Sequence, residues 1–417
     1  MKSVFTITSA WLWLSLLATL LVGCGAASTD PDAPPTPLSM EEIAVLGPAS
    51  NLAFGCVEEY RPGVSYFPDQ VSLEYAEGFT VEYFDTYKVI TVLDPWPGSD
   101  TTFQYLLVQC GTPAPEGFDD ALLVEVPAMS MVAMETTALP HLVALDLTGR
   151  LAGVGDFAYI NTPEIREMIA ADQVAEVGSG PQADVEQILN LAPDLVMTSG
   201  LGDPQNDAHP KLLEAGLTVA LDASHMEPSP LGRAEWIKFI AAFFNQEAAA
   251  ATVFADTATQ YNELAARAAD VGERPTVLMN APYQGTWYIP GGGSYQAQLL
   301  ADAGADYLWS DNAATGGEPL SFEAVFERAA NADYWLNTGT WNSLDEALAA
   351  DERFAEFAAV QNGTVYNNNA RVNESGGNAY WESGVANPHL LLADMIKIFH
   401  PDLLPEHELY FYQQLPE

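Results

Sequence analysis

Basic residues are scarce in this chain: Lys and Arg together number 14, against 57 Asp and Glu, for a formal net charge of −43. A charge of this size repels polyphosphate chains, and so few cations leave no basic stripe to displace their counterions. Nucleic-acid binding is therefore excluded. Because only 17% of the residues are charged, the imbalance is a shortage of base, which suits solubility at a salt-exposed surface.

Long apolar runs are also missing, except at the N-terminus, where Met1 and Lys2 precede a largely apolar stretch from Val4 to Val22. This arrangement is typical of a secretion signal. The stretch ends in Gly23-Cys24 and resembles the bacterial lipobox, in which Cys24 would be acylated and become the mature N-terminus. The alternative is an uncleaved membrane anchor. Either way, we expect the body of the protein outside the cytoplasm, in the periplasm or at the outer face of the cytoplasmic membrane.

Cysteine is rare as well, with 3 in the chain. Once Cys24 is assigned to the lipid, Cys56 and Cys110 form an even pair in an oxidising compartment, which favours a disulfide between them. Two buried free thiols are the alternative. Two isolated cysteines make no zinc motif, and the 6 histidines show no paired spacing, so we expect no bound metal ion as a cofactor.

At 417 residues the chain is too long for one core, since domains commonly hold about one to two hundred residues. Composition and pattern divide it into seven parts. We expect a lipoprotein signal at 1–24, a disordered proline-rich tether at 25–45, a β-rich extension at 46–128, an α/β lobe at 129–230, an interlobe helix at 231–272, a second α/β lobe at 273–400 and a tail at 401–417.

Short apolar stretches with turn residues between them predict antiparallel strands between residues 71 and 110. After Met129 the pattern becomes one of alternating strands and helices, as in an open α/β sheet. Within it we expect strands at 142–147 and 195–198, and helices at 163–170 and 185–191.

Helical spacing of apolar residues continues from Leu231 to Val271 with one probable break after Asn245. The part from Glu247 to Val271 would alone extend about 37 Å, enough to reach from one small lobe to another. We therefore expect a rigid rod of helix that holds two lobes apart. A weak internal repeat, a helix that begins with Glu followed by a strand and then Thr and Gly, suggests that the two lobes are similar.

These features, with the segment VEQILNLAPDLV at 185–196 and short glycine-containing motifs in a fixed order, resemble the ABC importer substrate-binding proteins that carry iron chelates and cobalamin. The resemblance covers about residues 130 to 400. It implies two Rossmann-like lobes, a monomeric receptor without enzymatic activity and delivery to a membrane permease. Glu186 and Glu323 stand where that family places the acidic residues that dock against permease arginines. Each also lies in a first helical turn, where a carboxylate is favoured without any partner.

Ligands of open α/β sheets bind at the carboxyl ends of strands, which selects the loops between the lobes. Aromatic side chains in these loops would suit the flat face of a chelate, a haem-like tetrapyrrole or a corrin. Arg371 would hold an acidic edge of such a ligand. The expected ligand-binding residues are Tyr159, Trp287, Tyr288, Tyr295, Trp341, Arg371, Tyr380 and Trp381, with Trp287, Trp341 and Trp381 first.

Three other functions stay open at this point. A receptor for a bare metal ion would need about three converging histidines. A surface lipoprotein could bind another protein through the extension. An extracytoplasmic enzyme is the third, although the chain has no P-loop spacing, no G-x-S-x-G elbow and no H-E-x-x-H.

Overall fold

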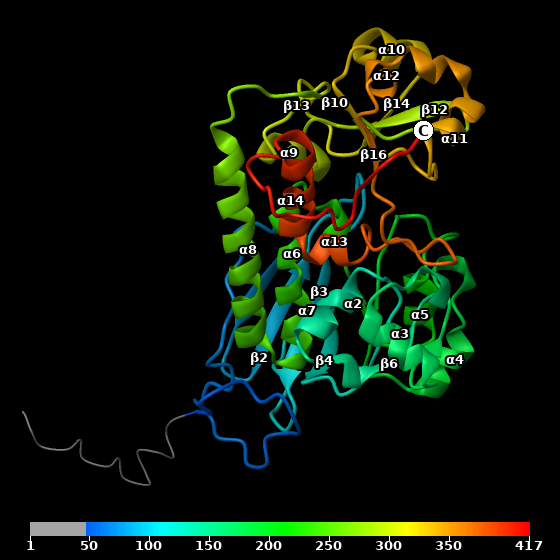
Figure 1. Cartoon of the computed structure of the whole chain (residues 1–417). Helices are drawn as coiled ribbons and strands as arrows, with labels where there is room; N and C mark the ends of the chain where they lie inside the picture. Colours follow the sequence, from blue (N-terminus) through cyan, green and yellow to red (C-terminus); the bar gives the residue numbers. More distant parts are fainter. Residues whose placement is uncertain (1–46) are drawn as a thin grey trace, which may run out of the picture. The chain divides into compact units, whose positions relative to one another are not determined.

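The structure, a computed structural model, describes residues 47–417. The expected signal, Cys24 and the tether lie outside these residues. Within them, no helix combines the length and apolar character needed to cross a membrane. Two α/β lobes, a long helix that joins them and a β-rich extension make up the described chain, as expected (Figure 1).

The extension contains a sheet with strand order β1-β2-β3-β4. The strands are β1 (Phe79–Tyr83), β2 (Tyr87–Val92), β3 (Phe103–Gln109) and β4 (Leu122–Val126). The first three pair antiparallel, whereas β4 pairs with β3 in parallel and leads into the first lobe. A disulfide between Cys56 and Cys110 joins the segment before β1 to the residue after β3.

The N-terminal lobe is a parallel sheet of order β7-β6-β5-β8-β9. Its strands are β5 (Met131–Ala133), β6 (Leu151–Val154), β7 (Ala175–Glu176), β8 (Leu195–Thr198) and β9 (Val219–Leu221). Its helices are α2 (Ala138–Ala144), α3 (Pro163–Ala170), α4 (Val185–Leu191) and α5 (His209–Glu214), with short 3-10 turns η1 (Thr148–Arg150), η2 (Phe157–Tyr159), η3 (Gly180–Gln182) and η4 (Ser224–Met226). The predictions for 163–170, 185–191 and 195–198 are confirmed.

The predicted strand at 142–147 is wrong, because residues up to Ala144 belong to α2. This helix packs against α7 and α13 and is buried over most of its surface. A helix buried all round shows no alternation of polar and apolar residues, so its apolar run resembles that of a buried strand.

The helical region between the lobes consists of α6 (Pro230–Glu235), α7 (Ile237–Phe244) and α8 (Glu247–Ala269). Asn245 adopts a left-handed conformation, with φ of 57°, and ends α7. The chain then reverses, so that α8 packs along α7 and α6. The expected rod beginning at Leu231 is therefore wrong in its first part, because a left-handed residue turns the helix axis instead of continuing it.

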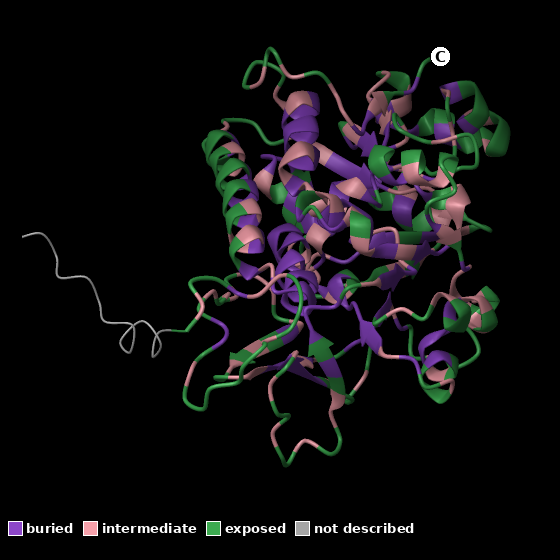
Figure 2. Ribbon diagram, turned by 90° about the horizontal axis from the view of Figure 1, so that it is seen from below, coloured by how far each residue is buried: buried purple, intermediate pink, exposed green. Residues whose placement is uncertain are grey.

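The long helix α8 makes the connection between the lobes (Figure 1). At 23 residues it extends about 35 Å. It packs against α9 and α14 of the second lobe, and its outer face is exposed (Figure 2). One side of α8 thus belongs to the core, as in a surface helix that supports two neighbouring units.

The C-terminal lobe has a sheet of order β13-β10-β15-β16-β17 and a smaller sheet β11-β12-β14. The strands are β10 (Thr276–Met279), β11 (Pro282–Tyr283), β12 (Thr286–Pro290), β13 (Asp306–Tyr307), β14 (Gly317–Leu320), β15 (Tyr334–Leu336), β16 (Val365–Asn367) and β17 (Gln413–Gln414). The helices are α9 (Tyr295–Asp302), α10 (Phe322–Ala329), α11 (Leu344–Ala350), η5 (Glu352–Glu356), α12 (Ala358–Gln361), α13 (Ser383–Ala386) and α14 (Pro388–Phe399). The segment expected as a tail supplies β17, which pairs antiparallel with β16.

The extension sheet packs on the helices between the lobes. Phe79 and Tyr105 make ring contacts with Phe239, and Phe79 also contacts Trp236. On β2, the buried Lys88 forms an ion pair with the equally buried first residue of α8. The extension is therefore part of the same core as α7 and α8.

Two buried carboxylates hold the chain just before β1. Glu235 accepts hydrogen bonds from the backbone N–H groups of residues 74–76, and Glu227 accepts from those of residues 77 and 78. Trp236 Nε1 also donates to Glu227, at 2.8 Å. Charged acceptors satisfied in this way make stronger hydrogen bonds than neutral ones. They fix the extension to α6 and to the loop that precedes it.

Candidate functional site

Three neighbouring strands of the C-terminal lobe end in asparagine. Asn280 follows β10, Asn337 follows β15, and Asn368 comes directly after β16. Asn280 and Asn337 have φ values of 62° and 60°, a left-handed conformation that asparagine tolerates better than most residues. Because parallel strands end at the same edge of a sheet, the three amides lie together where α/β folds bind ligands.

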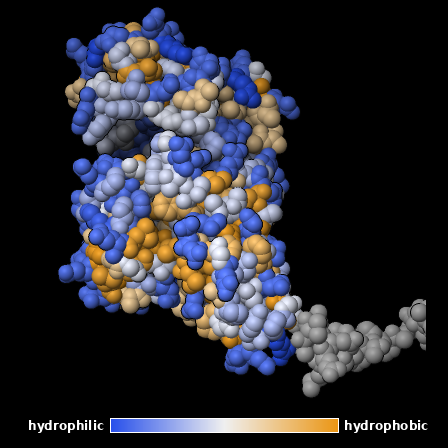
Figure 3. Space-filling model, turned by 180° about the vertical axis from the view of Figure 1, so that it is seen from behind, coloured by the Kyte–Doolittle hydropathy of each residue, from blue (hydrophilic) through white to orange (hydrophobic). Residues whose placement is uncertain are grey.

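These amides line an open recess of about 670 Å³, within the range of small-molecule sites. The described residues that line it include seven amides and no charged side chain. The amides are those of Asn280, Gln296, Asn337, Asn342, Asn368, Asn369 and Asn378. Figure 3 shows a hollow between the upper and lower parts of the described chain.

Three exposed aromatic side chains face this recess. Tyr283 is 67% exposed, and Tyr288 and Trp381 are each 47% exposed. Large aromatic surface left in water is unusual in a folded protein and marks binding sites when it lies in a concavity. The flat faces suit a planar or globular apolar ligand with polar edges.

The amide groups differ in how far the protein satisfies them. Asn280 Nδ2 donates to the carbonyl of Tyr288 at 2.8 Å, and Asn378 Nδ2 donates to the carbonyl of Asn368 at 3.1 Å. Asn337 is 5% exposed, and within residues 47–417 no group donates to its Oδ1. Its Nδ2 donates to the hydroxyl of the buried Tyr380 at 3.5 Å, so the head of this amide lies against the core beneath the recess.

Trp287 does not contact the recess, contrary to the sequence prediction, because its side chain is fully buried. Its ring packs 5.4 Å from that of Trp335, and its Nε1 donates to the carbonyl of Met279 at 2.9 Å. Side chains alternate along a strand, so Trp287 points into the core while its neighbour Tyr288 points out. Trp287 supports the recess from beneath.

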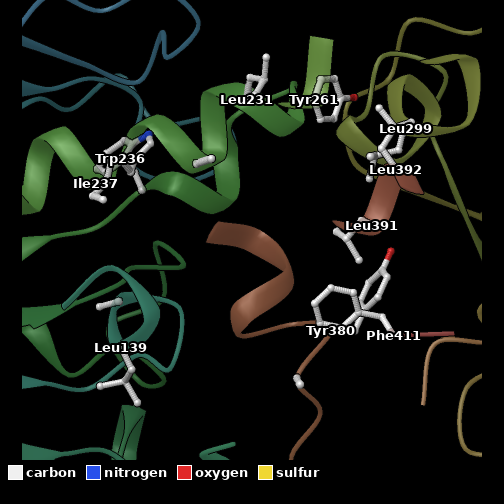
Figure 4. Close-up of a cluster of buried hydrophobic side chains, with 14 of the residues drawn as sticks. Leu139, Leu231, Trp236, Ile237, Tyr261, Leu299, Tyr380, Leu391, Leu392 and Phe411 are labelled. Atoms are coloured by element: carbon white, nitrogen blue, oxygen red, sulfur yellow. The ribbon is translucent and has the colours of Figure 1, made fainter. Parts of the chain in front are cut away.

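Tyr380 is also buried, at 1% exposed, and belongs to the hydrophobic cluster that Figure 4 shows beside Leu391 and Phe411. Tyr295 lies under the guanidinium of Arg233, 3.5 Å from its ring centre, and burial raises the pKa of the Tyr295 hydroxyl. Neither residue lines the open recess, and both lie instead around a small enclosed space beside Arg233 and Leu391.

Trp341 and Tyr159 also lie outside the lining of the recess. Trp341 is half-buried and packs on Trp335 and Phe354. Tyr159 is 57% exposed on η2 of the N-terminal lobe. Of the eight predicted residues, Tyr288 and Trp381 line the recess.

Arg371 turns away from the recess. Its Nε donates to the carbonyl of Tyr410 at 3.0 Å, and its guanidinium lies 3.7 Å from the centre of the Tyr410 ring. It lines a different hollow, with Asn161 and Glu164 of the N-terminal lobe. Arg371 therefore lies outside the lining of the aromatic recess, and its role in holding an acidic ligand edge stays a prediction.

The corresponding edge of the N-terminal lobe carries acids. Glu135 lies two residues beyond β5, Ser199 follows β8 and Asp222 follows β9. With Arg233 and His225 they line a cavity of about 120 Å³. Burial raises the pKa of the Glu135 and Asp222 carboxyls, and hydrogen bonds from Ser199 and Ser224 partly oppose this. Burial also lowers the pKa of His225, with a smaller contribution from Arg233.

The loop before α13 connects the recess to the N-terminal lobe. Asn373 Nδ2 donates to the carbonyls of Ala158 and Ile160, at 2.8 and 3.1 Å. Glu382 accepts from the backbone N–H groups of Asn161 and Thr162, at 2.6 and 2.9 Å. Trp381 therefore sits on a segment that both lobes hold in place.

Glu186 and Glu323 are exposed in the first turns of α4 and α10, one on each lobe. Glu323 lies 3.4 Å from the guanidinium of Arg353. Backbone and Ser321 hydrogen bonds, with Arg353, hold the pKa of Glu323 below its usual range. Neither carboxylate contributes to the core, so both remain accessible to a partner.

No group of three His, Cys, Asp or Glu in residues 47–417 could hold a metal ion. The residues that sequence reasoning missed are the asparagines of the recess. Their signal was present, since Met279-Asn280, Leu336-Asn337 and Asn367-Asn368 each place an amide at the end of an apolar strand. Asparagines that follow several apolar strands of one sheet predict a polar edge at which a ligand can bind.

The family described as periplasmic binding protein matches residues 131–371 of the chain. Two lipoproteins of Methanocaldococcus jannaschii with no described function are also similar. One is 24% identical over 82% of this chain and 84% of its own length, and the other is 27% identical over 75% and 80%.

Several solved structures share the fold. A periplasmic binding protein of Veillonella parvula matches with a TM-score of 0.52 at 17% identity, covering 78% of this chain and 98% of that one. Helicobacter pylori CeuE with Ni(II) bound matches with a TM-score of 0.52 at 16% identity, over 68% and 88%. The periplasmic heme-binding protein HutB of Vibrio cholerae matches with a TM-score of 0.50 at 21% identity, over 63% and 98%.

Proposed function

Because the chain belongs to the periplasmic binding protein family, we propose that it is a lipid-anchored receptor that captures a chelate-type ligand and delivers it to an ABC permease. The ligand class would be an iron chelate, a haem-like tetrapyrrole or a cobalamin-type ring. The lipid would be carried by Cys24, and the receptor would act without chemistry of its own. Two relatives named as lipoproteins, and similar structures named for heme binding and for bound Ni(II), support this assignment.

The observation that carries the proposal is the open recess at the carboxyl edge of the C-terminal lobe, with its exposed Tyr283, Tyr288 and Trp381. An enzyme of this size would be expected to place a nucleophile or an acid–base pair in its main concavity. The described lining has amides, aromatic side chains and a threonine, with no carboxylate, histidine, cysteine or lysine, and these groups can bind and orient a ligand.

Binding can be tested directly by native mass spectrometry of the protein purified from its own host. A small molecule of the expected class that travels with the chain would support the proposal. In a panel of chelates and tetrapyrroles, a ligand that binds only the folded protein raises the melting temperature by mass action. If no member of the panel raises it, the receptor assignment is wrong.

We further propose that Glu186 and Glu323 dock against cations of the permease. Both are exposed, and one lies on each lobe, so together they would fix orientation as well as attraction. The double substitution Glu186→Lys and Glu323→Lys should abolish uptake in cells and leave ligand affinity unchanged. The matched control reverses two exposed carboxylates elsewhere, Glu263→Lys and Glu356→Lys, and should leave uptake intact. Uptake that survives the first pair would disprove the docking role.

A further inference from the structure

We infer that the ligand of the recess carries no net negative charge and presents amide groups at its edge. This inference rests on the proposed receptor function and narrows its ligand class. It separates corrins bordered by carboxamides and uncharged ferric peptide hydroxamates from carboxylate-bordered tetrapyrroles and ferric catecholates.

The described lining of the recess carries no charged side chain. Of the described residues around the recess, none is Lys, Arg, Asp or Glu. A carboxylate moved out of water into such a site would lose hydration without gaining an ion pair, which costs several kcal/mol. An uncharged ligand with the same apolar area would not incur that cost.

Arg371 and Arg233 lie outside the lining of the recess and make contacts elsewhere. Arg371 donates to the carbonyl of Tyr410 and stacks on its ring. Arg233 donates to the carbonyls of His225 and Glu227, at 2.6 and 3.1 Å, and lies over Tyr295. Neither cation lines the recess, so an anionic ligand bound there meets no guanidinium in its wall. The net charge of −43 also opposes the approach of an anion.

The lining of the recess is rich in amides, each of which has N–H donors and an acceptor oxygen. A carboxamide also has both donors and an acceptor and can pair with either kind of group, whereas a carboxylate is an acceptor only. Side-chain amides on the wall can accept from and donate to a ligand amide in the same way. The aromatic faces of Tyr288 and Trp381 then cover the apolar body of the ligand.

The test uses two matched pairs of probes with the purified protein and isothermal titration calorimetry. One pair is dicyanocobinamide, a corrin bordered by carboxamides, against dicyanocobyrinic acid, the same ring bordered by carboxylates. The other is ferrichrome, an uncharged ferric hydroxamate, against ferric enterobactin, an anionic catecholate. We expect the uncharged member of at least one pair to bind at least tenfold more tightly than its anionic counterpart.

A variant with an added cation tests the same idea without relying on which probe the wild-type protein binds more tightly. Thr340→Lys adds a cation at an exposed position of the lining and should improve the affinity for the anionic member at least fivefold. Thr252→Lys makes the same charge change on the exposed face of α8 and should leave affinities unchanged.

The outcomes separate this inference from the proposed function. If an anionic probe is the tightest ligand of the wild-type protein, the ligand class is wrong and the receptor function stands. If no probe binds and no ligand accompanies the protein from its host, the receptor function itself is wrong. If Thr340→Lys and Thr252→Lys change affinities equally, the recess is not the binding site.

Discussion

After β5, β8 and β9, the N-terminal lobe places Glu135, Ser199 and Asp222; the C-terminal lobe places asparagines after β10, β15 and β16. The two edges occupy the same position in similar parallel sheets. One lines a cavity of about 120 Å³ and the other an open recess of about 670 Å³. The fold therefore provides two equivalent edges, which differ in the residues at their strand ends and in how open they are.

The difference lies in what covers each edge. Arg233 reaches from α6 over the acidic edge, and Val385 of α13 closes the same cavity. Nothing comparable lies over Tyr283 and Tyr288, which remain exposed. In the proposed receptor, the binding surface would therefore belong mainly to the C-terminal lobe, and the acidic edge would join the lobes.

The largest expected effect comes from uncovering the acidic edge with Arg233→Met. This removes two charge-assisted hydrogen bonds to His225 and Glu227 and the contact with the Tyr295 ring. Because the carbonyls lose their donor and a buried cation–π contact is worth about 2 kcal/mol, the free energy of unfolding should fall by about 3 kcal/mol. Urea denaturation measures the change.

Arg328→Met is the matched control, since the guanidinium of Arg328, like that of Arg233, lies over an aromatic ring. Arg328 differs in being at the surface, where it pairs with Asp311. It should lower stability by less than about 1 kcal/mol. Equal losses in the two variants would mean that Arg233 does not hold the lobes together, and the contrast between a covered and an open edge would lose its basis.

The next effect concerns the open edge. Trp381→Ala removes an exposed aromatic face from the recess and should weaken ligand binding by about 2 kcal/mol, or about thirtyfold. Stability should change little, because the ring is 47% exposed. The tightest probe of the panel above and calorimetry measure the affinity.

Tyr159→Ala provides the comparison for Trp381→Ala. Tyr159 is at least as exposed but lies outside the lining of the recess, so its loss should leave affinity unchanged. If Tyr159→Ala weakens binding as much as Trp381→Ala, the N-terminal lobe contributes directly to the ligand contact. The division of labour between the two edges would then be wrong.

The sequence was sufficient for the family, for the two lobes and for several elements at their true bounds, because motif order and helical spacing are local properties. The sequence did not predict which side chains of a strand face the recess or in which direction the chain turns after a helix. Trp287 and Tyr288 are neighbours on β12 with opposite burial, and strand alternation predicts that they face apart without saying which faces the ligand. At Asn245 the sequence likewise predicts a break in the helical spacing, but it does not predict that the chain reverses there.

The asparagines of the recess are visible in the sequence, but their pattern was not interpreted as a binding edge. Amides at strand ends attract less attention than Trp or Arg, because a single asparagine in a loop is common. Three of them after three adjacent strands gain meaning only once the strand order places β10, β15 and β16 side by side. The scarcity of basic residues also drew attention to Arg371. This residue lies outside the lining of the recess, and its Nε donates to the carbonyl of Tyr410.

The smallest expected effect is the change in stability caused by Glu135→Gln, which removes one acid from the N-terminal edge. Burial raises the pKa of Glu135 in the folded protein above the value of about 4.3 of an unfolded chain. The folded state therefore holds the proton more tightly, and this contribution to stability is present below that value and lost as the pH rises through the folded pKa.

Glutamine cannot ionise and retains an oxygen to accept from Ser199, so Glu135→Gln should match the wild type near pH 4 and exceed it at pH 8 by on the order of 1 kcal/mol. Melting temperatures at the two pH values measure this difference. Glu263→Gln on the exposed face of α8 removes the same charge and should show no such dependence on pH. If Glu135→Gln is less stable than the wild type at pH 8, the acidic edge is a satisfied polar network. The acidic edge and the asparagine edge would then differ in their residue types, but burial of the acids would not lower the stability of the protein.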